Sequence, residues 1–199
     1  MRNKTDGVRH AKASCLGRCP GSWLRNPRLR GGRVSYSNAE IGYASTEISG
    51  VDGDGLTLGL SVGLASNFFG FAGYNDYSYD GGFSSNQLTA GVGFHWPLND
   101  KIDLVTGLSY EDFEVKASGI GSASDDGFGL GAGLRGRLSE KFELSGGGKY
   151  IDLGGGSDDI IWMAAAHYYF TPKFALGADI SDGDSGTTFG IKLRYDFGR

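Results

Sequence analysis

The chain has 199 residues, enough for one domain, and it combines 36 glycines with 13% aromatic residues and only 4 prolines. This composition excludes a collagen-like or disordered chain, because apolar and aromatic residues recur along its length. The net charge of −4 is uneven: residues 1–33 hold 9 Lys and Arg and 1 acidic residue, and the rest holds the other 10 basic and 22 acidic residues of the totals of 19 and 23. An acidic body argues against a nucleic-acid partner.

Residues 1–33 form an atypical basic leader. A secretory signal has an apolar stretch of about 7–15 residues after its basic start, and no such stretch occurs here. We expect this segment to be disordered or to result from a misassigned start codon; a genuine basic tail is the alternative. Its Cys15 and Cys19 are the chain's 2 cysteines, and without a second pair they make a poor zinc site.

From Val34 onward, apolar side chains alternate with small or polar ones, which is typical of strands in a sheet with two unlike faces. The run from Leu56 to Leu64 is the clearest example. The chain has no run of about 18 apolar residues, so a transmembrane helix is excluded and any membrane crossing must use strands. The pattern predicts ten strands, with eight as the alternative count, at 34–48, 55–65, 68–79, 87–96, 101–114, 127–138, 142–152, 160–170, 174–181 and 187–197.

The predicted strand at 68–79 is the least regular, because Asn75 falls among Phe69, Phe71 and Tyr77. The predicted connections are of two alternating kinds. Four are tight: 66–67, 97–100, 139–141 and 171–173. Five are longer and rich in Gly, Ser and Asp: 50–55, 80–86, 116–126, 154–159 and 181–186. Transmembrane barrels show this alternation, with the tight turns on the periplasmic side.

Alternation alone does not say which face points outward, since a soluble lipocalin-like barrel alternates in the same way with its apolar face inside. Two features favour an apolar exterior. The other face consists largely of small residues, whereas a soluble protein's surface carries many Lys and Glu. Aromatic residues also gather near strand ends, as in the interfacial girdles of membrane barrels; the candidates are Tyr43, Trp96, Tyr150, Trp162, Tyr168 and Phe170. The predicted fold is therefore all-β, a single closed antiparallel up-and-down transmembrane β-barrel spanning 34–199.

Ionisable residues on the inward face form the main candidate site. Unpaired charges in a confined interior are costly, so we expect them to pair across strands. A tight network would plug the lumen, and a looser one would pass small ions. The predicted set is Glu40, Asp103, Glu111, Arg135, Arg137, Glu143, Lys149, Asp179, Lys192, Arg194 and Asp196. Arg135 and Arg137 have Glu111, Asp103 or Glu143 as candidate partners, and Lys192 and Arg194 have Asp179 or Glu40.

Signals for catalysis are weak. His95 and His167 fall on the inward face near the tight turns, but neither is paired by spacing with a nucleophile, and we interpret them as lumen histidines. The segments 52–55 and 182–186 resemble calcium loops without completing the ligand set. The glycine runs at 127–133 and 146–148 lie in strand pattern with no helix after them, which argues against a nucleotide site. We expect no catalytic residue, metal or cofactor.

The last predicted strand resembles the C-terminal assembly signal of bacterial outer-membrane proteins, through Gly190, Leu193, Tyr195 and Phe197. It departs from that signal in that Gly198 and Arg199 follow the final aromatic residue. Together with 36–43 and the hairpins of 55–80, it makes residues 34–199 similar to small porin-like, OmpA-type outer-membrane barrels of proteobacteria. The resemblance implies the outer membrane of a Gram-negative bacterium, lipid and lipopolysaccharide as surroundings, and the barrel-assembly machinery as a partner.

The leading hypothesis is a non-enzymatic outer-membrane barrel that is structural or a narrow porin-like channel, and we expect a monomer. The alternative is an adhesion or interaction protein that binds a ligand with its surface loops. A lipid-modifying barrel enzyme is a third hypothesis, for which the sequence offers no convincing triad.

Overall fold

A computed structural model describes residues 33–48, 50–117, 119, 121–154, 157–184 and 186–198. The leader predicted for 1–33 lies, apart from Arg33, outside the described residues. The described chain is all-β and contains ten strands. They are β1 (Asn38–Ile48), β2 (Val51–Ala65), β3 (Phe68–Tyr79), β4 (Phe83–Pro97), β5 (Ile102–Ala117), β6 (Gly121–Arg137), β7 (Phe142–Leu153), β8 (Ser157–Tyr169), β9 (Phe174–Gly183) and β10 (Gly186–Asp196).

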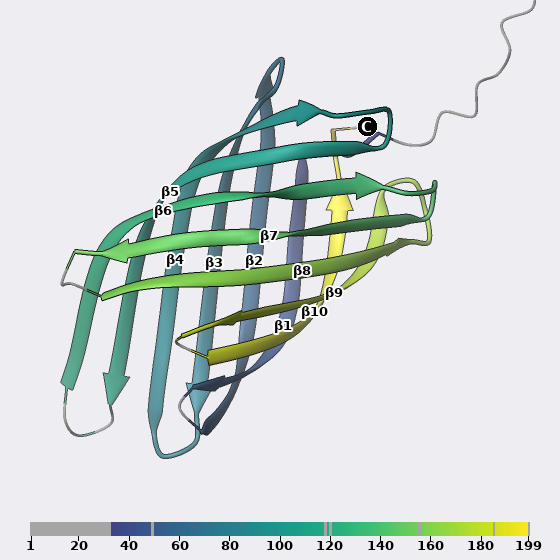
Figure 1. The fold of residues 1–199 in the computed structure, drawn as a ribbon. Coiled ribbons are helices and arrows are strands. Elements are labelled where there is room, and N and C mark those ends of the chain that lie inside the picture. Colours follow the sequence, from purple (N-terminus) through teal and green to yellow (C-terminus); the bar gives the residue numbers. More distant parts are fainter. Residues whose placement is uncertain are drawn as a thin grey trace, which may run out of the picture. The chain divides into compact units, whose positions relative to one another are not determined.

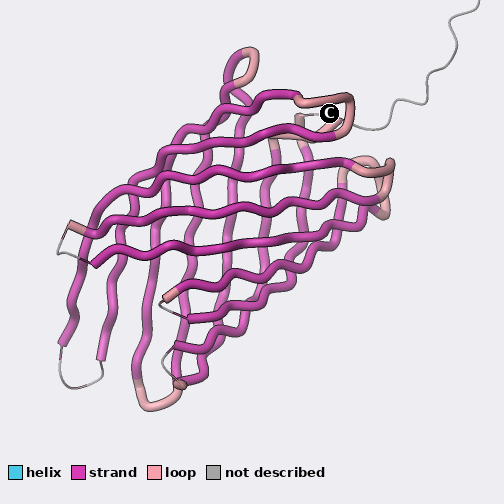
Figure 2. The backbone as a smooth tube through the Cα atoms, viewed as in Figure 1, coloured by secondary structure: helices cyan, strands magenta, loops and turns pink. Residues whose placement is uncertain are grey.

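Each strand pairs antiparallel with its sequence neighbours, and β1 also pairs with β10, from Asn38 opposite Asp196 to Glu47 opposite Thr187. This last pairing closes the sheet into a barrel of tilted strands (Figures 1 and 2). Closure removes the sheet edges, so no strand is left with a row of unpaired backbone groups. The predicted class and strand count are confirmed. Among the described residues, none forms a helix that is long and apolar enough to cross a membrane.

Tight connections occur at both ends of the barrel, contrary to the predicted alternation. The end that carries the connections after β2, β4, β6 and β8 is called the turn rim, and the other end is called the loop rim. The strand bounds leave two or three residues between strands at the loop rim, as at 80–82, where Gly81 and Gly82 have φ of 89° and 83°. Backbone in this region favours glycine.

The predicted long loops are mostly strand. The clearest case is 116–126, where β5 and β6 remain paired as far as Ala117 opposite Gly121. Gly, Ser and Asp in this segment therefore mark the place where the strands leave the apolar band, and not the place where they end.

The outward face is a continuous apolar surface. Leu58 is paired with Ile41, Ile41 with Leu193, and Leu193 with Leu176, so four neighbouring strands present apolar side chains at one level. Each of these four side chains is between 42% and 54% exposed. A water-soluble protein rarely exposes a large contiguous apolar patch, and a wall of this kind is what a membrane barrel turns toward lipid. The interior, by contrast, carries the buried polar and charged residues.

Glycines on the inward face make room for long side chains that lie along the wall. A Cβ atom at Gly129 would be 2.6 Å from Lys149 Cε and 2.9 Å from Glu111 Oε1. A Cβ atom at Gly177 would be 2.5 Å from His167 Cδ2. The high glycine content is thus partly explained by charged and aromatic side chains that pack flat over glycine backbone.

Candidate functional site

Glu143 on β7 is the centre of the charge network that fills the turn-rim half of the lumen. Its Oε1 atom lies 2.7 Å from Arg135 Nη2 and 2.7 Å from Arg194 Nη1, and its Oε2 atom lies 3.9 Å from Arg137 Nη1. The hydroxyl of Tyr169 also donates to Oε2 over 3.3 Å. Glu143 is only 1% exposed, so its charge is balanced by guanidinium groups and not by water.

A second group continues the network toward β1, β9 and β10. Glu40 Oε1 lies 2.5 Å from Arg194 Nε and 3.5 Å from His167 Nε2, and Glu40 Oε2 lies 3.7 Å from Lys192 Nζ. Lys192 in turn lies 3.0 Å from Asp179 Oδ1. Arg194 therefore joins Glu40 to Glu143, and the inward charges of β1, β7 and β10 form one connected cluster.

Glu111 and Lys149 form a separate pair on the wall. Lys149 Nζ lies 2.6 Å from Glu111 Oε1, across the glycine backbone of β6. Glu111 is buried and also accepts hydrogen bonds from Gln87, Thr89 and Ser109. Four donors around one carboxylate satisfy its oxygens in place of water. Glu111 was a candidate partner of Arg135 and Arg137, and the structure places it with Lys149 instead.

The network ends at the turn rim with Arg137, Tyr169 and Asp196. The guanidinium carbon of Arg137 lies 3.7 Å from the centre of the Tyr169 ring, a cation–π contact. The Tyr169 hydroxyl also lies 3.1 Å from Asp196 Oδ2. All three residues are buried, so the barrel is filled at this level.

Tyr36, just before β1, reaches across the lumen and was missed as a site residue. Its ring stacks on His95 with centroids 4.1 Å apart, its hydroxyl donates to Asp103 over 2.9 Å, and Arg135 lies 5.1 Å from its ring centre. These contacts lie on β4, β5 and β6, on the far side of the barrel from β1. The alternation of the strand could have indicated it, because residues 36, 38 and 40 share one face and Glu40 was already predicted to point inward.

Both lumen histidines have acidic neighbours inside the barrel. His95 Nδ1 lies 3.5 Å from Asp103 Oδ2, and His167 Nε2 lies 3.5 Å from Glu40 Oε1. The 52–55 segment lies within β2. Among the described residues, no group of three or more His, Cys, Asp or Glu side chains is arranged to hold a metal ion.

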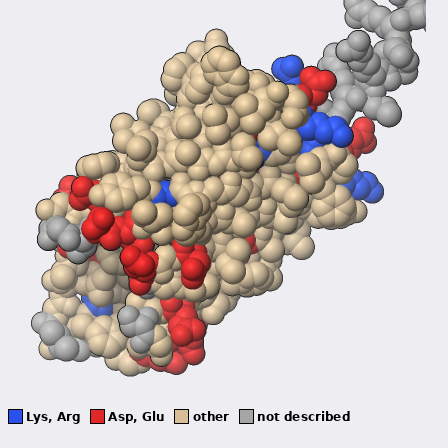
Figure 3. Space-filling view, viewed as in Figure 1, with Lys and Arg blue, Asp and Glu red and all other residues tan. Residues whose placement is uncertain are grey.

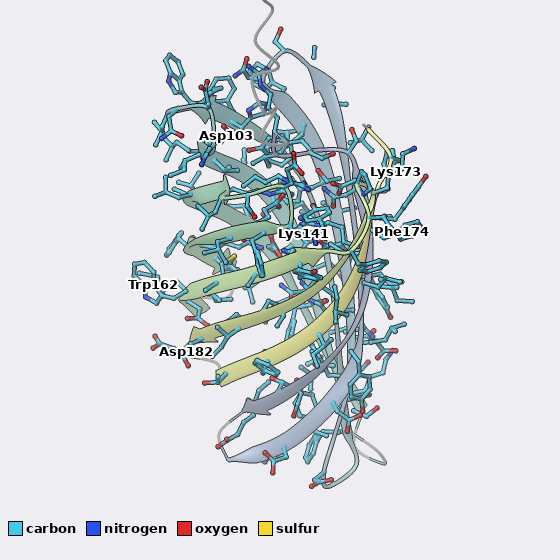
Figure 4. All side chains as sticks on the ribbon, turned by 90° about the vertical axis from the view of Figure 1, so that its right-hand side faces the viewer. Asp103, Lys141, Trp162, Lys173, Phe174 and Asp182 are labelled. Atoms are coloured by element: carbon cyan, nitrogen blue, oxygen red, sulfur yellow. The ribbon has the colours of Figure 1, made fainter. Side chains whose placement is uncertain are left out.

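Most of the candidate interface aromatics face outward. Trp96 is 60% exposed and Trp162 is 64% exposed, and Trp162 stands away from the barrel wall in Figure 4. Tyr43, Tyr168 and Phe170 are also exposed, and Tyr150 is half-buried. Tyr43 lies in the middle of β1, and its hydroxyl donates to Asp54, toward the loop rim.

Phe69 and Phe71 of β3 point inward, which explains the irregular alternation of this strand. Phe69 is 8% exposed and packs over Gly93, where a Cβ atom would lie 2.2 Å from its ring. Phe71 packs in the same way against Gly91. The outward positions of β3 are instead those of Phe68, Gly70, Ala72 and Tyr74. The lumen therefore contains an apolar part as well as the charge network.

Exposed charges differ between the two ends of the barrel. Figure 3 shows acidic side chains gathered at one end, and Lys and Arg together with a few acidic side chains near the other. The loop rim carries exposed Glu47, Asp52, Asp54, Asp76, Asp80, Asp125, Asp126, Asp158, Asp182 and Asp184. Exposed Lys101, Lys141 and Lys173 lie in the connections of the turn rim, together with exposed Asp100 and Glu140. The wall between the rims is apolar, so the two charged ends bound the apolar band.

A closed ten-stranded barrel with an apolar exterior and a charged, glycine-rich lumen is a transmembrane β-barrel. No family model matches the chain, and no curated protein matches it. Solved structures similar to it are outer-membrane barrels. The N-terminal β-barrel domain of Pseudomonas aeruginosa OprF aligns with a TM-score of 0.47 and 12% identity over 81% of this chain and 100% of that one.

Two further similar structures have lower scores. The KdgM porin aligns with a TM-score of 0.43 and 13% identity over 79% of this chain and 99% of that one. Ail, the attachment invasion locus protein of Yersinia pestis, aligns with a TM-score of 0.40 and 14% identity over 80% of this chain and 95% of that one. The likeness at these scores is one of barrel architecture.

Proposed function

We propose that this chain is a non-enzymatic outer-membrane barrel of a Gram-negative bacterium, with a structural role and a lumen closed by its charge network. The observation that carries the proposal is the contact between opposite walls. Arg194 on β10 reaches Glu143 on β7, and Tyr36 reaches Asp103 on β5. Side chains that meet across the lumen narrow it at this level, which supports a closed lumen that passes no ions.

A narrow porin-like channel is the competing function, and conductance separates the two. Refolded protein is added to a planar bilayer after a heat-dependent gel shift has shown that the barrel is folded. We expect the wild-type protein to insert without unitary currents. Steady ohmic currents from the wild-type protein would contradict the closed lumen.

A variant that removes the central contacts tests whether the network is the barrier. The combined variant Arg135→Ala, Glu143→Ala and Arg194→Ala removes cations together with the carboxylate they share, which limits uncompensated charge. We expect this variant to conduct. The matched control is Glu114→Ala with Lys116→Ala, a pair 2.9 Å apart near the loop rim and outside the lumen; it should remain silent.

We propose lipid and lipopolysaccharide as the surroundings of the barrel, and the C-terminal residues Gly190, Leu193, Tyr195 and Phe197 as the signal for the assembly machinery. Tyr195 and Phe197 face outward, with ring centroids 6.4 Å apart. Phe197→Ala should reduce the amount of folded barrel in cells and leave refolding in detergent unchanged. We also propose a monomer, because closure leaves no strand edge for a second copy.

The adhesion alternative receives little support from the loop rim. Its strand connections hold only two or three residues. The longest strands that reach this rim are β5 and β6, with 16 and 17 residues. A surface ligand would therefore meet strand ends and acidic side chains instead of long loops.

A further inference from the structure

The loop-rim half of the lumen contains a cavity of about 650 Å³. It extends from Arg135 and Lys192, in the charge network, to Ile48, Tyr79 and Gly186, which are terminal residues of their strands at the loop rim. The charge network thus forms the floor of the cavity, and the loop rim surrounds its top. Sites for small molecules have volumes of about 300–1,000 Å³, so the cavity is large enough for a ligand.

Aromatic side chains form one wall of the cavity. Phe71, Tyr77 and Tyr79 of β3 and Phe113 of β5 line it. Phe71 is held against the wall because β4 and β5 present glycines beneath it: a Cβ atom would lie 2.7 Å from Phe71 Cζ at Gly91, and 3.3 Å from Phe71 Cε1 at Gly107. The ring therefore lies beside the cavity and leaves it empty.

The opposite wall has few side chains. Gly131, Gly133 and Gly147 of β6 and β7 line the cavity, together with Met163 and Ala165 of β8. The nearest atom to a Cβ atom at Gly131 would lie 3.7 Å away, so this position has room for a side chain. A flat apolar group in the cavity would therefore have aromatic rings on one side and glycine backbone on the other.

The charged lining of the cavity is mainly cationic. Arg135, Lys149 and Lys192 contribute to the lining, and Asp179 is the acidic residue beside them. The side chains of Arg135 and Lys149 are 14% and 18% exposed, whereas their partners Glu143 and Glu111 are each 1% exposed. Because Glu143 and Glu111 are more deeply buried than their partners, a molecule beside Arg135 and Lys149 meets the positive groups first. Lys192 is 20% exposed and has Asp179, 26% exposed, beside it. An anionic group would be favoured there.

We propose that this cavity is a binding site for a small aromatic carboxylate. Its ring lies between the β3 aromatic side chains and the glycine wall of β6 and β7, and its carboxylate lies toward Lys149 and Arg135. This inference does not depend on whether the floor conducts ions. It concerns the loop-rim half of the lumen, and its test measures binding and not current.

The probe is 2-naphthoate, with the uncharged 2-naphthylmethanol as its neutral analogue, measured by equilibrium dialysis against folded barrel in detergent. We expect saturable binding of naphthoate and at least roughly tenfold weaker binding of the alcohol, about 1.4 kcal/mol. Gly131→Leu should abolish binding by filling the cavity. Ala90→Leu is the matched control, since it adds the same side chain at an outward position of β4 and should bind like the wild-type protein.

A double variant tests the role of the cation. Lys149→Met with Glu111→Gln removes one cation from the cavity and the buried carboxylate behind it, so neither charge is left unpaired. We expect roughly tenfold weaker naphthoate binding with an unchanged gel shift. Equal binding by the wild-type protein and Gly131→Leu would place the probe in the micelle or on the outer wall and overturn the proposal. Equal binding of acid and alcohol would overturn its anionic part.

Discussion

Arg194 Nη1 lies 2.7 Å from Glu143 Oε1, although β9 and β8 stand between their strands in the barrel. The contact therefore crosses the lumen and does not follow the wall. It is supported on both sides, because Arg194 also contacts Glu40 and Glu143 also contacts Arg135. The interior of this barrel is held together by charge pairs at the level where a soluble protein would have an apolar core.

Glu143→Gln should lower the stability of the barrel substantially. The substitution keeps the shape of the side chain but leaves Arg135 and Arg194 without their shared carboxylate. Removing one partner of a buried ion pair costs about 3–5 kcal/mol. The measurement is the temperature at which the folded band is lost on a gel, in one detergent. Glu114→Gln is the control, since Glu114 contacts exposed Lys116 near the rim; an equal loss in both variants would contradict the central role of Glu143.

Gly129→Ala should destabilise the barrel, whereas Gly131→Ala should not. Both glycines face inward on β6. A Cβ atom at Gly129 would meet Lys149, Ser109 and Glu111 within 2.9 Å, whereas at Gly131 the nearest atom would be 3.7 Å away. Overpacking of this kind costs about 1–3 kcal/mol. Urea or guanidinium unfolding followed by tryptophan fluorescence measures the difference, and two variants of equal stability would refute the explanation of Gly129.

The number of strands, the closure of the barrel and the outward face of most strands could be predicted from the sequence, because the alternation of apolar and small or polar residues is visible within each strand. The run from Leu56 to Leu64 shows it directly, and its leucines are exposed in the structure. The 68–79 strand was harder to interpret. Phe69 and Phe71 are apolar yet point inward, and the space that admits them is provided by Gly91, Gly93 and Gly107 on two other strands.

The candidate site shows a similar division. The alternation was enough to select the inward charges, since Glu111 follows outward Tyr110, Arg135 follows outward Leu134, and Glu143 lies between outward Phe142 and Leu144. The individual partners depend on strand register and on which side chains reach across the lumen. The contact between Glu111 and Lys149 crosses Gly129, so it depends on three strands at once. Tyr36 precedes β1, and its contacts with β4, β5 and β6 have no local signal.

Leu58→Arg tests the membrane orientation of the apolar wall. Leu58 lies in the middle of β2, is 42% exposed, and is paired with outward Ile41 and Tyr74. An arginine on the lipid face destabilises a barrel by about 2–4 kcal/mol at the bilayer midplane, and this cost falls to about 0–1 kcal/mol near the interfaces. We therefore expect Leu58→Arg to unfold from lipid vesicles at clearly lower guanidinium concentration than the wild-type protein.

The matched control for Leu58→Arg is Ser78→Arg, at an outward position of β3 beside Asp54, close to the loop rim. Its arginine lies among exposed carboxylates at the edge of the apolar band, so the unfolding midpoint should stay near that of the wild-type protein. The difference between the unfolding midpoints of the two variants reports the depth of each position in the bilayer, because the same side chain is introduced in both. If both variants unfolded at the same guanidinium concentration, the wall at Leu58 would not be facing hydrocarbon. A wild-type protein that stayed soluble and folded without detergent or lipid would lead to the same conclusion, because a surface of this size would then be in contact with water.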